Sequence, residues 1–184
     1  SVDINWPQSM SEAPSNGDPK ELVNLLCKSA ALPASNLGVI EVPFRGRTVK
    51  IAGDRTFDTW SATFFNDKDM LLRSYFEKWL EKINSHELNN APLFKPDNSE
   101  GYMATVGVKQ LRKDATASGT VLRQYDLYHS FPTSVSQIDL AYDSNDQIEE
   151  FTVEWQYSYF TATKADNKTT AGAAVKGDAS GRFV

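Results

Sequence analysis

The sequence predicts a mainly β (α+β) fold: a small antiparallel β-barrel or sandwich with one flanking α-helix at about residues 69–84. Three observations support it. Alternating apolar and polar residues, typical of half-buried strands, recur along the 184 residues; turn residues separate these segments; and one segment has helical spacing instead. We expect one domain over residues 1–160, followed by a C-terminal tail over residues 161–184 that is flexible or ordered by a partner.

The alternation begins at once, with Val2, Ile4 and Trp6 among polar neighbours. Because a strand starts so abruptly, we expect further residues upstream in the natural chain. Residues 7–20 are rich in proline and small polar residues, which predicts a long loop. Residues 21–31 fit either a short helix or a strand, and the sequence leaves both open.

A β-hairpin is predicted next. Extended runs at residues 39–44 and 48–52 flank the tripeptide Arg45-Gly46-Arg47, in which glycine can supply the positive φ of a tight turn. A further strand is expected at residues 60–64, where apolar and polar residues again alternate.

The helical segment, residues 69–84, repeats large apolar residues at i and i+4, as an amphipathic helix does. Four antiparallel strands are predicted after it, at residues 102–111, 121–131, 136–142 and 148–160, with turns between them that include 132–134. In the last strand one face is apolar throughout and contains Phe151, Val153, Trp155, Tyr157 and Tyr159.

The charge balance and apolar patterning exclude several classes of protein. The 19 basic and 24 acidic residues give a net charge of −5, which argues against a protein that holds nucleic acid by counterion release. The single cysteine, Cys27, cannot form an internal disulfide. Apolar runs are far shorter than the roughly 20 residues that span a bilayer, so no direct membrane insertion is expected.

No catalytic, cofactor-binding or metal-binding residues can be assigned from the sequence, and no cofactor is expected. The two histidines, His86 and His129, lie in no recognisable motif, and phosphate-binding, dinucleotide-binding and paired-cysteine patterns are missing from the sequence. We therefore do not expect an enzyme.

The distribution of charge is more informative. Between residues 136 and 159 every charged residue is acidic: Asp139, Asp143, Asp146, Glu149, Glu150 and Glu154. The hairpin region is basic instead, through Arg45, Arg47, Lys50 and Arg55. Both sets are candidates for solvated faces. Alternatively, the acidic surface of one copy faces the basic hairpin of the next, or the acids line a passage through which a polyanion slides without sticking.

Three stretches together resemble a known family. They are residues 27–34 (CKSAALPA), residues 52–67 (AGDRTFDTWSATFFND), and residues 131–146 (FPTSVSQIDLAYDSND) continuing into 148–155 (IEEFTVEW). Their order and spacing, with the helix between them, resemble the major tail tube proteins of contractile-tailed bacteriophages, whose fold is shared with type VI secretion tube proteins. The resemblance covers about residues 1–160.

The resemblance implies a structural virion protein that forms hexameric rings with itself. The rings would stack into the hollow inner tube of the phage tail, which conducts DNA into the host during contractile ejection. The implied partners are the tail sheath protein, the baseplate or tube initiator, the tape measure protein and the tail terminator, with transient, non-specific passage of phage DNA. Assembly would take place in the cytoplasm of the host bacterium.

Under this resemblance, the two charged sets acquire roles. We expect the hairpin residues Arg45, Gly46, Arg47, Lys50 and Arg55 to mediate stacking between rings. Part of the acidic set from Asp139 to Glu154 is expected to face the channel or an interface between copies, where like charge keeps DNA mobile. The alternatives are an inner-tube or tube-initiator protein of another contractile injection system, and a hexameric effector carrier like those of type VI secretion.

Overall fold

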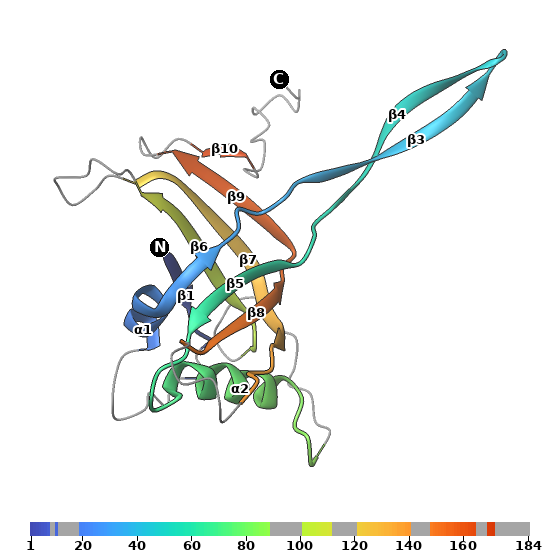
Figure 1. The fold of residues 1–184 in the computed structure, drawn as a ribbon. Helices are drawn as coiled ribbons and strands as arrows, with labels where there is room; N and C mark the ends of the chain where they lie inside the picture. The colour runs from blue at the N-terminus through green and yellow to red at the C-terminus, as the bar shows by residue number, and fades with distance from the viewer. Residues whose placement is uncertain are drawn as a thin grey trace.

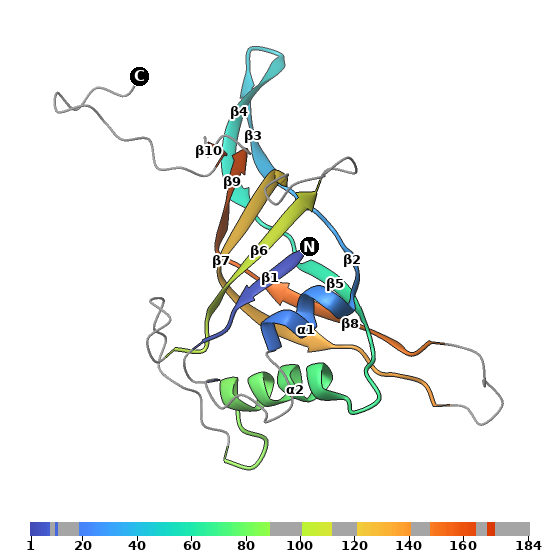
Figure 2. The same cartoon turned by 90° about the vertical axis from the view of Figure 1, so that its left-hand side faces the viewer.

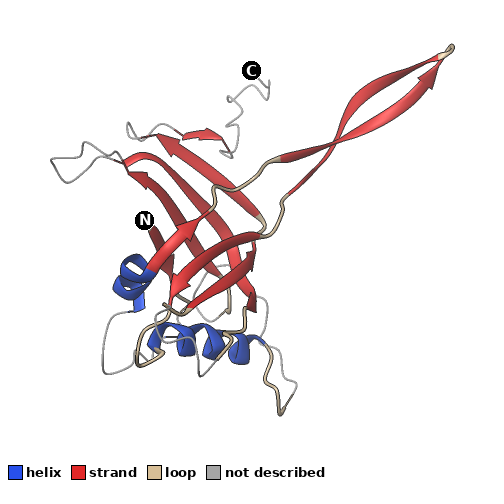
Figure 3. Cartoon of the chain, viewed as in Figure 1, coloured by secondary structure: helices blue, strands red, loops and turns tan. Residues whose placement is uncertain are grey.

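The structure is a computed structural model, and it describes residues 1–7, 10, 19–88, 101–111, 121–140, 148–164 and 169–171. The described residues form two helices and ten strands (Figures 1 and 3). In chain order these are β1 Val2–Asn5, α1 Pro19–Leu26, β2 Cys27–Ala30, β3 Asn36–Phe44, β4 Arg47–Thr56, β5 Trp60–Phe65, α2 Leu71–Ile83, β6 Ala104–Leu111, β7 Val121–Val135, β8 Glu150–Gln156, β9 Tyr159–Lys164 and β10 Thr169–Ala171. None of these helices is long and apolar enough to cross a membrane.

An antiparallel sheet makes up the body of the domain, which confirms the predicted fold class. Its strands follow the order β1-β6-β7-β8-β5-β2, and β9 pairs with both β7 and β10. The strands curl around a common interior, as Figure 2 shows. Strands β3 and β4 stay outside this sheet and pair with each other.

The long strand β7 joins the two halves of the sheet. Its first part pairs with β9 and its last part with β8. The change of partner coincides with His129, whose φ of 54° breaks the extended backbone. Opposite this bend, the backbone N–H of Ser158 donates to the carbonyl of Tyr128 over 3.0 Å. At this bend β7 passes from one half of the sheet to the other, so that the sheet curves around the core.

The core lies between the curled sheet and α2, which packs across one end of the strands (Figure 1). Aromatic side chains dominate it: the Phe76 ring on α2 lies 5.6 Å from those of Phe64 on β5 and Trp155 on β8, measured between centroids. The Trp6 ring packs against the same helix, with its centroid 5.3 Å from that of Trp79. The predicted helix 69–84 is thus confirmed, because its apolar stripe covers the open end of the sheet.

Residues 21–31, for which helix and strand were both open, contain one of each: α1 ends at Leu26 and β2 begins at Cys27. The helix α1 is therefore a second helix beside the one that the sequence predicts. Cys27 is half-buried against the core, and burial raises the pKa of its thiol.

Three predicted boundaries in the C-terminal half are wrong. The predicted turn 132–134 lies inside β7, where the ladder with β8 shifts register between Pro132 and Ser134. The predicted strand 136–142 is not a strand over 136–140, and its last two residues lie outside the described residues. The physical reason is Ser136: its side-chain oxygen, instead of its carbonyl, accepts the Thr152 N–H over 2.9 Å, which ends the ladder.

The predicted strand 148–160 is divided into β8 and β9 by the break opposite His129. Phe151, Val153, Trp155 and Tyr157 are buried as expected. After the break, however, Phe160 takes the inward position that the alternation assigns to Tyr159, and Tyr159 is exposed. Strand β9 continues to Lys164 and β10 follows, within the segment predicted to be a tail; the division at residue 160 stays a prediction.

Candidate functional site

The hairpin β3–β4 projects away from the domain (Figure 1). It confirms the hairpin predicted from the extended runs around Arg45-Gly46-Arg47, and it is longer at both ends, from Asn36 to Thr56. Nearly all its residues are exposed. A two-stranded ribbon with no further layer is marginally stable in water, so this ribbon is suited to pack against another molecule.

The hairpin has two chemically different faces, because residues paired across an antiparallel ladder point to the same side. On one side Ile40 pairs with Ile51 and Val42 with Val49, and Phe44 lies opposite Arg47 near the tip. These five apolar side chains are 41–58% exposed. We call Ile40, Val42, Phe44, Val49 and Ile51 the apolar face.

The other side of the hairpin carries its charged pair, and we call it the polar side, although Val39 at its base pairs with Ala52 and is 60% exposed. Glu41 pairs with Lys50 in the ladder, and their charged groups lie 3.5 Å apart. Because both side chains are more than half exposed, this ion pair contributes little to stability. The remaining pair toward the tip, Pro43 with Thr48, has no large aliphatic group.

The tip carries two of the predicted basic residues. Arg45 and Gly46 form the turn, with φ of 45° and 84°, and Arg47 opens β4. The Arg45 guanidinium lies 5.5 Å above the ring of Phe44. Arg55 is not part of this group: it lies at the base of the hairpin, where it donates to the Ser35 hydroxyl over 2.9 Å. The structure thus places Arg45, Gly46 and Arg47 together and separates Lys50 and Arg55 from them.

The predicted acidic set is also divided. Asp143 and Asp146 lie outside the described residues, whereas Asp139 and Glu149 are exposed at the ends of the segments that flank them. Glu150 is neutralised, because the Lys28 ammonium on β2 lies 2.5 Å from its carboxylate. Glu154 is exposed in the middle of β8. The set is therefore not a single patch.

Two exposed apolar residues accompany Asp139 and Glu149. Leu140 is 77% exposed and Ile148 is 70% exposed, which places both among the four most exposed large hydrophobic residues described. We call Asp139, Leu140, Ile148 and Glu149 the acidic end. It lies beside α2: the Arg73 guanidinium donates to the Ser136 carbonyl over 2.9 Å, and the Asn66 amide N–H donates to the Glu149 carbonyl over 2.8 Å.

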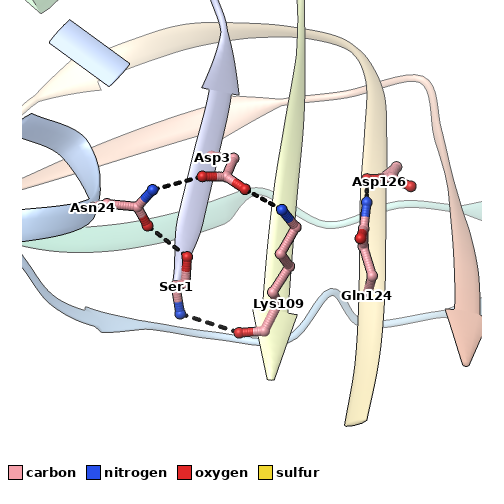
Figure 4. A network of polar contacts seen from close by, with 6 residues as sticks. All are labelled: Ser1, Asp3, Asn24, Lys109, Gln124 and Asp126. Atoms are coloured by element: carbon pink, nitrogen blue, oxygen red, sulfur yellow. Dashed lines mark hydrogen bonds and ion pairs between the residues drawn. The ribbon is translucent and has the colours of Figure 1, made fainter. Parts of the chain in front are cut away.

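A third polar feature lies on the outer side of β1, β6 and β7 (Figure 4). The Asn24 amide donates to Asp3 over 2.6 Å, and the Lys109 ammonium donates to the other oxygen of the same carboxylate. Next to this pair, Gln124 donates to Asp126 over 2.8 Å. Burial alone would raise the pKa of Asp3, but the bonds from Lys109 and Asn24 outweigh it and hold that pKa below its usual value. The network ties β1 to the sheet.

The described part of the chain offers little for catalysis. It contains no cluster of three or more His, Cys, Asp or Glu residues suited to a metal ion. His86 is exposed beyond α2 and contacts Glu81, which accepts a hydrogen bond from the His86 backbone over 3.1 Å. His129 lies at the bend of β7, with its ring 5.6 Å from that of Tyr159.

The sequence analysis singled out the basic residues of the hairpin and missed its apolar face. The signal was present, because Ile40, Val42 and Phe44 alternate in one strand and Val49 and Ile51 in the next. Such alternation is normally taken as packing against the domain's own core. The exposure of its five side chains and the projection of the hairpin show that this face is not covered by the described domain.

Comparisons with known proteins agree with one another. A family model described as phage tail tube protein matches residues 1–163. The chain is 34% identical over 134 residues to the tail tube protein gp19 of Enterobacteria phage T4, which covers 73% of this chain and 78% of that protein. It is 28% identical over 156 residues to a tail tube protein of Serratia phage KSP90, covering 85% and 81%.

Solved structures share the fold. A chain in the sixfold-symmetrised cryo-EM structure of the anti-feeding prophage baseplate superposes with a TM-score of 0.59, covering 89% of this chain and 91% of that chain, at 14% identity.

Proposed function

Since the chain belongs to the phage tail tube protein family and is a structural component of the tail of a contractile phage, we propose that its copies form hexameric rings that stack into the hollow inner tube. Sixfold symmetry is supported by the solved baseplate that contains a chain of the same fold. No catalytic step belongs to this function, because the protein acts as the wall of a conduit.

The hairpin β3–β4 is the observation that carries the proposal. Its apolar face is exposed in the single chain, and covering a half-exposed aliphatic or aromatic side chain contributes on the order of 1 kcal/mol. Five such side chains on one ribbon, repeated in every copy, provide a substantial driving force for self-association. A projecting arm of this kind connects one ring to the next.

The conduit would carry phage DNA. A wall of net negative charge keeps a polyanion mobile, and the chain has a net charge of −5. Of the described acids predicted for the channel, Glu154 is an exposed candidate in the middle of a strand, whereas Glu150 is neutralised by Lys28. Placement of Glu154 toward the lumen stays a prediction.

The other partners follow from a place inside a tail. A tube needs a baseplate or initiator at one end and a terminator at the other, a sheath around it, and a tape measure protein in its lumen during assembly. The exposed charges on α2, which include Glu77, Lys78 and Lys82, form an outer surface suited to the sheath.

Negative-stain electron microscopy of the purified chain over a concentration series, with light scattering for the mass of soluble species, tests the proposal. Hollow tubes, or sixfold rings that stack at high concentration, are the expected result. A monomer at every concentration, also when a baseplate nucleus is added, would overturn it.

A further inference from the structure

The hairpin and the acidic end lie near opposite ends of strand β5. The hairpin ends with β4, and the chain then enters β5 at Trp60. At its other end β5 stops at Phe65, and the next residue, Asn66, forms hydrogen bonds with Glu149. In Figures 1 and 2 the hairpin extends from the top of the domain, whereas the end of β7 and the start of β8 lie low in the view. One copy therefore presents the two surfaces at different ends of the domain.

The two surfaces are complementary in chemistry. The hairpin combines an apolar face with Arg45 and Arg47, and neither arginine forms an ion pair among the described residues. The acidic end combines two exposed apolar side chains, Leu140 and Ile148, with the carboxylates of Asp139 and Glu149. These carboxylates accept hydrogen bonds only from neutral amides in the described structure, Gln137 for the former and Asn66 for the latter.

We propose that the hairpin of one copy docks on the acidic end of the next, with the apolar face against Leu140 and Ile148 and the arginine tip against Asp139 and Glu149. This inference rests on the proposed function and names the surface that receives the hairpin. The occupant is a second copy of this chain, because both halves of the contact are present on every copy and each is unsatisfied in the single chain.

The position of the two surfaces also determines the kind of assembly. A contact between two different patches is heterologous, so it leaves one hairpin and one acidic end unoccupied after each addition. Such a contact does not form a two-fold dimer: it closes into a ring if its rotation closes, and otherwise it gives an open array that repeats along an axis. This is the connectivity that successive rings of a tube require.

A charge exchange tests the docking. Arg45→Glu with Arg47→Glu should reduce the yield of tubes by about tenfold or more, because like charges then face each other. Asp139→Lys with Glu149→Lys should do the same. The variant with all four substitutions should recover most of the wild-type yield, because the pairing is restored with its sign exchanged.

The control is Glu41→Lys with Lys50→Glu, which exchanges the two charges of the cross-strand pair on the polar side of the same hairpin and should leave the yield of tubes unchanged. All the altered side chains are exposed, so circular dichroism and melting temperature of dispersed protein should match the wild type. The docking would be overturned if the variant with all four substitutions failed to recover tubes, or if Arg45→Glu with Arg47→Glu assembled normally. In either case, tubes from the wild type would still support the proposed function. Absence of tubes from the wild type would instead contradict the proposed function itself.

Discussion

Gly38 and Gly53 lie backbone against backbone at the base of the hairpin: a Cβ added to Gly53 would stand 3.3 Å from the carbonyl carbon and oxygen of Gly38. The ladder shifts register at the same place, because Leu37 pairs with Arg55 but Val39 pairs with Ala52. Strand β4 thus has one residue more than β3 over this stretch, which makes a β-bulge and increases the local twist. The bulge sets the direction in which the hairpin leaves the domain.

Substitution Gly53→Ala should reduce tube assembly with little change in the melting temperature of the domain. The new methyl group would also lie 3.1 Å from Cγ1 of Ile40, so the two strands should shift by a few tenths of an ångström at the bulge and change the direction of the hairpin. Sedimentation of tubes and thermal unfolding of dispersed protein measure the two effects. The matched control is Thr48→Ala on the polar side of the same strand, which adds no atom between the two strands and should assemble normally. Unchanged assembly of Gly53→Ala would show that the bulge does not aim the hairpin.

Polar substitutions on the apolar face should keep the protein dispersed. Ile40→Ser with Ile51→Ser removes a cross-strand pair whose side chains are 54% and 52% exposed, so the isolated domain loses little and the contact between copies loses two apolar groups. Light scattering at increasing concentration should show a delayed onset of assembly. Glu41→Gln with Lys50→Gln on the polar side is the control and should assemble normally. Equal effects of the two pairs would argue against the apolar face as the contact surface.

Substitution Phe76→Ala should destabilise the domain by about 3–5 kcal/mol, because it removes the aromatic side chain that joins α2 to β5 and β8 and leaves a cavity. Urea unfolding measures the loss. The exposed neighbour Glu77, which pairs with Arg73 over 2.8 Å, provides the control: Glu77→Ala should change stability by about 0.5 kcal/mol or less. A loss below about 1 kcal/mol in Phe76→Ala would contradict the placement of α2 over the core.

The Asp3 network predicts an acid-sensitive attachment of β1. The pKa of Asp3 is lowered in the folded protein, so its stabilisation is complete above the unfolded pKa of about 3.9 and is lost as the pH falls through the lower folded pKa. The stability difference between the wild type and Asp3→Asn should therefore shrink as the pH falls below about 4. Urea unfolding of both proteins at several pH values measures it. A difference independent of pH would mean that the carboxylate charge is not what holds β1.

Much of the fold could be predicted from the sequence because local patterns and final packing agree there. The stripe of α2 and the alternation of Phe151, Val153 and Trp155 both mark surfaces that pack on the core. Prediction failed where one residue breaks a pattern. No local signal distinguishes the left-handed His129, which bends β7, or the side chain of Ser136, which ends its ladder.

The candidate site was harder to predict for the same reason. Arg45, Gly46 and Arg47 were placed correctly at a hairpin turn, because turn chemistry is local. Which acids stand near which hydrophobic residues depends on tertiary structure instead. Glu150 belongs to the same acidic run as Glu149, yet it faces Lys28, which lies 122 residues away in the chain.

Cryo-electron microscopy of tubes assembled from the chain tests the central claim most directly. The account predicts sixfold rings in which each hairpin β3–β4 reaches the neighbouring ring and its apolar face is covered by the acidic end of another copy. Tubes or rings in which the hairpin extends into solvent, or particles with a two-fold contact between single copies, would contradict it.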